Sequence, residues 1–403
     1  MENWKRTVYL LTLCNLCMAL GFSQVGPIMP IYFHHMGVES AEELSLWSGL
    51  ASGVTYLVVC FCAPFWGRLA DRKGRKITLI RSSLGMALCN LALGFAATPE
   101  TVVIIRALQG VVNGFNSAAF TLLVTQVPED RTGWSLGILS TGQMSGTLLG
   151  PLIGGYIAST FGIRNDFLLI WTFMLIAFLI IMVFIKEDFT PEPSQEKQSF
   201  STMKAHIPHF NIVLSLYVAS FIFAICAQAL QPIITVYIKG MVPPNTSNLP
   251  LIAGAVFSCT GIAQLLSTSN LGKLVDRVGP RKILIISLIY VGLLNIPQAY
   301  VDNVYLLGLV RFLQGLGMGG LLPALNAFLS RQTPKAYTGQ VFAYNQSCLF
   351  LGYFLGSIGG AGLMASLGFT ALFWISALLF VFCALWIAFR VPAESSISPS
   401  VKE

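Results

Sequence analysis

One apolar stretch of the chain carries four polar side chains at positions where they share a helical face. Arg106, Gln109, Asn113 and Asn116 follow one another at intervals of three, four and three residues. At 3.6 residues per turn, all four fall within about 80° of arc on one side of a helix. A charged side chain within an apolar span is costly, and it normally faces the protein interior or a water-filled cavity. We therefore expect Arg106 to point inward, either into a cavity or toward a structural partner on a neighbouring helix.

Other polar residues lie singly in the remaining apolar stretches and are candidates for the wall of a binding cavity. A wide apolar pocket with few polar anchors is the usual small-molecule site. Nearby aromatic residues such as Phe22 and Phe115 would suit a planar, lipophilic ligand. Each of these residues can equally serve in packing. The candidates are Gln24, Gln109, Asn113, Asn116, Gln143, Gln228, Gln231, Gln264, Arg311, Asn326, Tyr344 and Asn345.

The sequence shows no constellation typical of an enzyme or a metal centre. Of the four histidines, His34 and His35 end one apolar stretch and the other two lie in a polar linker. The nine cysteines all lie inside apolar stretches, and their pattern argues against a disulfide framework or a metal site. Only 10% of the residues are charged, 55% are hydrophobic and the mean hydropathy is +0.73. These values exclude a soluble enzyme, a disordered chain and a nucleic-acid-binding protein, and we expect no cofactor.

The elements that must position these side chains are apolar segments long enough to cross a bilayer as helices. A span needs about 20 apolar residues, and twelve segments meet this length. Most lysines and arginines fall at the N-terminus, after even-numbered segments or in the C-terminal tail, whereas the loop 39–43 carries three acids and no base. By the positive-inside rule, both termini are cytoplasmic. The predicted spans are 7–33, 45–66, 77–96, 101–125, 135–159, 165–186, 211–238, 250–271, 282–300, 304–330, 339–365 and 369–391.

The two halves of the chain repeat each other. At a shift of 205 residues Pro27 matches Pro232 and Arg106 matches Arg311, and at a shift of 206 Gly162 matches Gly368. We expect an N-terminal six-helix half at 1–186, a cytoplasmic linker at 187–210, a second half at 211–391 and a cytoplasmic tail at 392–403. A parallel repeat of this kind places a substrate site near the bilayer midplane, with access alternating by rocking. A purely structural duplication is the alternative.

Two cytoplasmic loops and one glycine-rich helix carry a family resemblance. Residues 67–76 read GRLADRKGRK and residues 272–282 read GKLVDRVGPRK, and both resemble loop signatures of the major facilitator superfamily. The run from Gly146 to Gly155, GTLLGPLIGG, is similar to the helix-five signature of exporters. The chain most resembles twelve-helix drug:proton antiporters, in particular bacterial multidrug efflux permeases of the PmrA and MdtG type. This implies an all-α integral membrane protein of the major facilitator fold, with two six-helix halves.

The resemblance also implies roles for individual residues. It implies that the loop aspartates latch the halves in one conformation, with Arg75 in the charge network, and that Arg106 takes part in proton coupling. The alternative for the loop charges is that they only fix the topology, and small-residue packing alone would explain the glycines. The residues concerned are Gly67, Asp71, Arg72, Gly74, Arg75, Asp276 and Arg277 in the loops, and Gly146, Gly150, Pro151, Gly154 and Gly155 in helix five.

The chain departs from the family in the position of its acids. Many drug:proton antiporters carry a membrane acid in helix one or four, whereas here we expect Asp166 and Asp302 at the external ends of their spans and no acid deep in any span. The candidates for proton coupling are therefore Arg106, Asp71, Asp166 and His34. Histidine titrates nearest to physiological pH.

The sequence thus predicts a secondary transporter of the bacterial cytoplasmic membrane that exports amphipathic drugs in exchange for protons. A lipid or lysolipid flippase, or a sugar or metabolite exporter, is the alternative on the same scaffold. The expected partners are small amphipathic molecules, protons and membrane lipid, with no nucleic acid and no obligate protein partner. Three other classes of membrane protein are disfavoured. An enzyme would need a catalytic constellation, and a receptor would need a larger soluble part. A channel would not need the latch loops.

Overall fold

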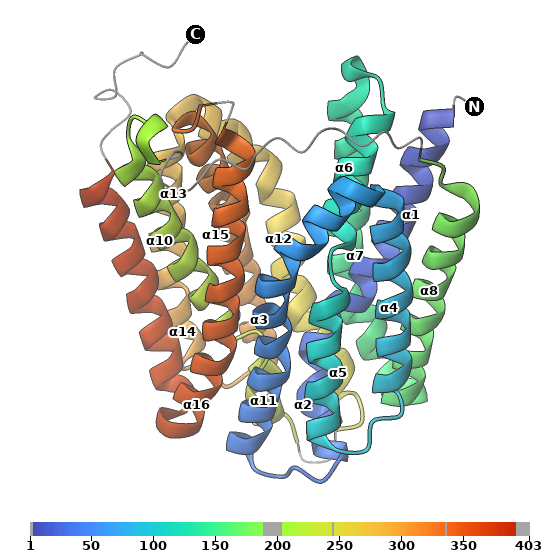
Figure 1. Cartoon of the computed structure of the whole chain (residues 1–403). Coiled ribbons are helices and arrows are strands. Elements are labelled where there is room, and N and C mark those ends of the chain that lie inside the picture. The colour runs from blue at the N-terminus through green and yellow to red at the C-terminus, as the bar shows by residue number, and fades with distance from the viewer. Residues whose placement is uncertain (1–2, 188–203, 244–245, 335–336, 392–403) are drawn as a thin grey trace. The chain divides into compact units, whose positions relative to one another are not determined.

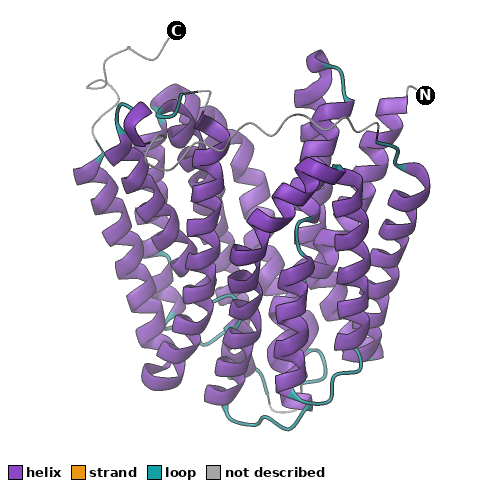
Figure 2. Ribbon diagram, viewed as in Figure 1, coloured by secondary structure: helices purple, strands orange, loops and turns teal. Residues whose placement is uncertain are grey.

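The computed structural model describes residues 3–187, 204–243, 246–334 and 337–391, which form helices joined by short turns, with no strand among them (Figures 1 and 2). Helices satisfy every backbone polar group within one segment, which the hydrocarbon of a bilayer requires. The predicted tail 392–403 and most of the predicted linker 187–210 lie outside the described residues.

The first sequence repeat folds into six spans, two of which are broken (Figure 1). A break at Gln24 divides the first span into two helices, and a break at Asn113 and Gly114 divides the fourth. The helices are α1 (Asn3–Ser23), α2 (Val25–His35), α3 (Ala41–Lys73), α4 (Arg75–Leu93), α5 (Pro99–Val112), α6 (Phe115–Gln126), the short η1 (Glu129–Arg131), α7 (Thr132–Phe161) and α8 (Ile163–Phe184).

The second repeat folds in the same order. Its last helix, α16, is 53 residues long but has a non-helical backbone at Gly368 (φ 79°), so it comprises two spans. The helices are α10 (Phe210–Ala229), α11 (Ile234–Lys239), α12 (Leu249–Val278), α13 (Pro280–Leu293), α14 (Asn295–Gln298), α15 (Val304–Arg331) and α16 (Thr338–Arg390).

Length and composition alone identify nine candidate spans within the described part of the chain. Two further helices are long enough to cross a bilayer but are more polar: α4 carries three basic residues and α7 is rich in glycine, serine and threonine. With these two, and with α16 divided at Gly368, the described residues provide the twelve predicted spans. Large apolar side chains such as Phe61 and Phe389 are exposed, as expected where a helix faces lipid.

Local signals set the helix boundaries. The Ser40 side chain accepts a hydrogen bond from the Glu43 amide at the start of α3, and Thr98 caps α5 with Pro99 at its first position. At the matched positions Gly162 and Gly368, one glycine with positive φ (89° and 79°) turns one span into the next. Within the first repeat we call this the Gly162 end, and the opposite end, with the turn at Gly74, the Gly74 end.

The chain packs as two compact units whose boundaries differ from those of the sequence repeats. Unit 1 comprises the described parts of Met1–Gln195 together with Pro232–Ser258, and unit 2 comprises those of Glu196–Gln231 and Cys259–Glu403. A short segment of the second repeat, residues 232–258, therefore packs with the first repeat.

Helix pairing follows the repeat inside each unit. In unit 1, α1 packs against α7 and α4 against α8; in unit 2, α10 packs against the first part of α16 and α13 against its second part. The core of unit 2 is built from apolar side chains of α10, α13, α15 and α16, including the fully buried Phe328 and Phe380. The duplicated fold is thus visible in packing as well as in sequence.

Candidate functional site

Arg106 lies in the interior of unit 1, as the sequence predicts, and its partners are neutral. The side chain is 4% exposed, its Nε donates to the Ala51 carbonyl at 3.2 Å, and one guanidinium NH₂ donates to Gln109 Oε1 at 2.6 Å. The Thr55 hydroxyl donates to the Arg106 carbonyl at 2.9 Å and ties α5 to α3. Hydrogen bonds to a charged group are worth about 1.5–3 kcal/mol each, so these contacts hold the guanidinium in place without an acid.

The expected four-residue face is interrupted at Asn113. Asn113 ends α5 with extended backbone (ψ 167°), and Gly114 has φ 123°, a conformation that favours glycine. Arg106 and Gln109 therefore lie on α5, whereas Asn116 lies on α6. The expectation of one continuous helical face is wrong, because the spacing rule holds only along an unbroken helix.

Arg81 is a second arginine at this break, and we did not single it out from the sequence. Its guanidinium stacks on the Trp66 ring at 3.6 Å and donates to the Asn113 carbonyl at 2.8 Å and to the Val111 carbonyl at 3.3 Å. It thereby satisfies carbonyls that the end of α5 leaves without helical partners. The sequence did give one signal of its importance: Arg81 is a charged residue at the fifth position of the predicted span 77–96.

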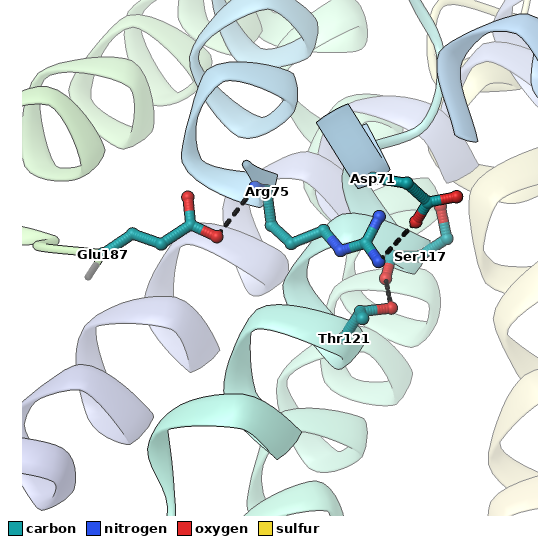
Figure 3. A network of polar contacts seen from close by, with 5 residues as sticks. All are labelled: Asp71, Arg75, Ser117, Thr121 and Glu187. Carbon is teal, nitrogen blue, oxygen red and sulfur yellow. Dashed lines mark hydrogen bonds and ion pairs between the residues drawn. The ribbon is translucent and has the colours of Figure 1, made fainter. Parts of the chain in front are cut away.

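The predicted latch loop forms a compact charge network at the Gly74 end (Figure 3). Gly74, with φ 91°, turns α3 into α4 in a single residue. Asp71 and Arg75, one helical turn apart in sequence, form an ion pair of 2.6 Å, in which the aspartate side chain is 52% exposed and the arginine 23%. Ser117 and Thr121 of α6 lie close to this pair in the same view.

Glu187 joins the same network, and we did not predict a role for it. Its two carboxylate oxygens accept the backbone amides of Arg75 at 2.8 Å and Lys76 at 2.7 Å. An anion here satisfies free amides and complements the positive end of the helix dipole. A residue three positions beyond the end of α8 therefore caps the first turn of α4, as Figure 3 shows for Arg75.

The second copy of the loop makes different ionic and hydrogen-bond contacts. Asp276 has a proline, Pro280, four residues on, where Asp71 has Arg75. Its ionic partner is instead Arg331 at the end of α15, at 3.9 Å, and both side chains are well exposed. Arg281 turns away and donates to the Ala388 carbonyl at 2.6 Å.

The glycines of α7 form the surface against which α1 packs closely. A Cβ at Gly146 would lie 2.6 Å from the Leu16 carbonyl oxygen, and one at Gly154 would lie 2.6 Å from Gln24 Oε1. Gly150 is in contact with Ser23, whose hydroxyl donates to the Gly146 carbonyl at 3.2 Å. In unit 2, Gly352, Gly356 and Gly360 of α16 face α10 in the same way. Any side chain at these positions would push the paired helices apart.

Gly155 and Pro151 of α7 face a different neighbour, the start of α12. Backbone carbonyls touch the glycines in both directions, Pro250 against Gly155 and Pro151 against Gly254. The Leu251 amide donates to Ser159 Oγ at 3.2 Å, and the Ser258 hydroxyl donates to the Leu148 carbonyl at 2.9 Å.

The 232–258 segment also contacts α2. The Thr235 hydroxyl donates to the Pro27 carbonyl at 3.0 Å. The segment thus packs on three elements of the first repeat, α2, α3 and α7, and these contacts lie within unit 1.

Asp166 lies in the first turn of α8, at the end of its span where the sequence places it, but it is buried there. Its side chain is 0% exposed, and Oδ2 accepts a hydrogen bond of 3.0 Å from the amide of Gln24, itself 3% exposed. Oδ1 has no hydrogen-bond partner among the described residues. The spacing placed Asp166 correctly in the first turn of α8 but gave no sign that the α1–α2 break would cover it.

Energetics disfavour an ionised Asp166 in this position. Taking a carboxylate out of water costs several kcal/mol. One hydrogen bond to a charged group returns about 1.5–3 kcal/mol, and a helix N-terminus typically about 0.3–1 kcal/mol. The surroundings therefore favour the neutral acid.

His34 lies exposed at the end of α2, with the His35 ring 6.4 Å away. Partial burial lowers the pKa of His34, and Lys239 and His35 lower it further, while Glu39 opposes them. The imidazole is thus biased toward its neutral form.

The remaining cavity candidates divide between packing positions and half-buried positions. Asn345 is a packing residue, because its Oδ1 accepts the Ser220 hydroxyl and ties α16 to α10. Arg311 is 5% exposed and its Nε has no hydrogen-bond partner among the described residues, while Asn326 is exposed. The half-buried candidates are Gln143 in unit 1 and Gln228, Gln231, Gln264 and Tyr344 in unit 2.

Comparison with known proteins matches this arrangement to a family over almost the whole chain. A family model described as the Major Facilitator Superfamily matches residues 11–242 and 216–403. The multidrug resistance protein MdtG of Salmonella arizonae is 41% identical over 384 residues, which cover 95% of each chain. MdtG of Enterobacter lignolyticus is 40% identical over 384 residues, covering 95% of this chain and 92% of the relative.

Solved structures agree at the level of the fold. The nucleoside transporter NupG superposes with a TM-score of 0.77 at 13% identity, covering 96% of this chain and 100% of that one. A bacterial homologue of the human lysosomal transporter Spinster, inward-facing and unoccupied, gives 0.75 at 14% identity over 97% and 96%. With its duplicated six-helix repeat, its two loop signatures and these matches, the chain belongs to the major facilitator superfamily of membrane transporters.

Proposed function

We propose that this protein is a proton-driven exporter of amphipathic drugs in a bacterial cytoplasmic membrane. The observation that carries the proposal is the identity of 41% with MdtG, a multidrug resistance protein, over 95% of both chains. In this orientation both termini and the Gly74 end face the cytoplasm, in line with the distribution of basic residues.

Alternating access would require the two six-helix halves, 1–186 and 211–391, to rock against each other. The contacts of the 232–258 segment with α2 and α7 are those that must break when the substrate site opens at the Gly162 end. They include a few hydrogen bonds and close backbone contacts at glycines. The segment also buries apolar side chains, among them Ile234 and Ile238, so its separation would expose apolar surface as well.

In this proposal the charge network at the Gly74 end is the latch of the opposite state. The Asp71–Arg75 pair and the Glu187 cap fix the geometry of the α3–α4 turn. Arg106, held by neutral partners, is free of a competing acid and contributes a fixed positive charge to the interior of the first half.

Proton movement coupled to a drug gradient tests this function. We would reconstitute the protein in liposomes that are acidic inside and follow a pH-sensitive dye while adding ethidium, a quinolone or another lipophilic cation. We expect each exported drug to accelerate the loss of internal acid. Liposomes without protein and the Arg106→Ala variant are the controls, and we expect neither to respond.

If no compound moves protons with wild-type protein, the proposal is wrong. Lipid flipping would then be measured on the same vesicles with a fluorescent lysolipid.

A further inference from the structure

We propose that Asp166 is the group that binds and releases the coupled proton, with Gln24 as its positioning residue. The inference deepens the proposed function and rests on it, because a proton site matters only if the transporter is proton-driven. It assigns to one buried carboxyl group a task that the sequence leaves open among four residues.

The geometry of the pair is that of an acid poised between two charge states. The Asp166 side chain is fully buried, with one oxygen 3.0 Å from the Gln24 amide nitrogen and the other without a partner among the described residues. A buried carboxylate needs a cation or several donors, and here it has a single neutral donor. The surroundings therefore fit the protonated acid, and a rearrangement that brings water or a cation would release the proton.

Among the described residues, no cation on the elements packed against α8 neutralises this carboxyl group. Arg164 is two positions away on the same helix, where side chains do not face each other, and its guanidinium stacks on the Phe95 ring at 4.2 Å. On α2 the nearest titratable group is Tyr32, whose hydroxyl donates to the Ala96 carbonyl at 3.0 Å. In the part of the chain that the structure describes, α4 offers Cys89, α7 offers Tyr156 and α1 offers Cys14 and Cys17, none of them a cation, and the bases of α1 and α4 lie toward the Gly74 end.

Gln24 connects the carboxyl group to a contact that must change during transport. The amide oxygen of Gln24 lies against Gly154 of α7, and the next residue, Gly155, lies against the Pro250 carbonyl at the start of α12. Ionisation of Asp166 would draw the Gln24 amide and further donors toward the anion. Because Gln24 is wedged against α7, such a movement would reach the seat of the 232–258 segment.

The other three candidates lack this combination. Asp71 is half-exposed and already paired with Arg75, and His34 is exposed at the end of α2. Arg106 keeps its proton at any physiological pH. Only Asp166 among the four unites complete burial, a carboxyl group and an unpartnered oxygen.

The first experiment compares Asp166→Asn with wild-type protein in the dye assay. Asparagine keeps the shape of the neutral acid but cannot release a proton. We expect drug-dependent proton movement to fall to the level of protein-free liposomes, while ethidium exchange down its own gradient continues. Asp302→Asn, at an exposed aspartate of the second repeat, is the matched control and should behave as wild type.

The second experiment uses Gln24→Ala and remains informative if Asp166→Asn does not fold. Loss of the Gln24 hydrogen bond destabilises the ionised form of Asp166 more than the neutral form. The drug-coupled release of the proton should therefore need a higher pH. We expect its half-maximum to move up by about one pH unit. A merely structural role of Gln24 would lower the rate without moving the profile.

The outcomes separate this inference from the proposed function. If wild-type protein moves no protons with any drug, both fail. If wild-type protein and Asp166→Asn both move protons with ethidium, or if the Gln24→Ala profile does not shift, the assignment of Asp166 alone is overturned.

Discussion

At the scale of single residues, the two loop aspartates show how one motif can make two different contacts. Asp71 has a partner one helical turn away, 2.6 Å distant, whereas Asp276 has a proline at that position and a partner 3.9 Å away on another helix. Exposed ion pairs contribute about 0–1 kcal/mol, and the shorter, less exposed pair should lie at the upper end.

We therefore predict that Asp71→Asn impairs transport more than Asp276→Asn. A loss of about 1 kcal/mol corresponds to a change of about fivefold in the latched population. Initial rates of ethidium export from proteoliposomes, normalised to the amount of folded protein, measure the effect. Equal losses in the two variants would show that the Arg75 pair has no special role.

The sequence predicts which way a charged side chain points more reliably than which residues surround it. The inward position of Arg106 follows from the cost of a charge in lipid, which holds for any helix arrangement. The burial of Asp166 depends on the break at Gln24 and on a contact between residues 142 positions apart, and no local pattern encodes such a contact. The cap by Glu187 is likewise a contact across more than a hundred residues.

At the scale of helices, glycines divide into those that seat a neighbour and those that do not. On α7, Gly146 is pressed against Leu16 and Ala19 of α1, whereas Gly137 has no atom within 4 Å of an added Cβ. The same substitution should thus have opposite effects at two positions of one helix.

We predict that Gly146→Ala destabilises the protein by about 1–3 kcal/mol, as overpacking does. Gly137→Ala, the control, should stabilise it by about 0.5–1 kcal/mol, because alanine loses less backbone entropy in a helix. Thermal unfolding in detergent compares the two variants. A stable Gly146→Ala protein would mean that α1 and α7 tolerate a wider separation.

A second prediction concerns the first turn of α4, which Glu187 caps. Glu187→Gln keeps the shape but loses the negative charge at the helix N-terminus, and we expect a loss of about 0.5–1 kcal/mol. Faster hydrogen exchange of the Arg75 and Lys76 amides would report it. Glu100→Gln is the control for the charge alone, since Glu100 also lies in the first turn of a helix, α5, but is exposed where Thr98 already provides the cap.

Helix positions followed from the apolar pattern, and the breaks inside them did not. Asn113 and Gly114 look like ordinary members of an apolar stretch, but their backbone ends one helix and starts another. The Arg81 side chain donates a hydrogen bond to the Asn113 carbonyl at this break. That role could not be predicted without knowing that the helix ends there. Repeat-matched glycines at 162 and 368 were visible, and both turn out to be turns with positive φ.

At the scale of the whole molecule, the repeat defines the fold, but it does not define the compact units. The sequence divides the chain near residue 210, whereas residues 232–258 pack with the first repeat. A duplication records ancestry and internal symmetry, and the contacts of one conformation can still join segments across that division.

This packing predicts that a cross-link between α7 and the 232–258 segment stops transport. The Leu251 amide lies 3.2 Å from Ser159 Oγ, so Ser159→Cys with Leu251→Cys should form a disulfide on oxidation. The experiment needs a background without the nine native free cysteines. We expect ethidium export to cease with oxidant and to return with dithiothreitol, and each single-cysteine variant to be insensitive. Full activity of the cross-linked protein would show that this contact need not open.

The single-glycine turns at Gly162 and Gly368 have a practical consequence. Each joins two spans with almost no intervening chain. These turns therefore offer a protease or an antibody no extended loop to bind. Epitope tags or reporter domains inserted there would have to unwind helix on both sides. In the proposed orientation, surface labelling of intact cells should therefore rely on the longer connection between α2 and α3, at 36–40, where the backbone already leaves the helix.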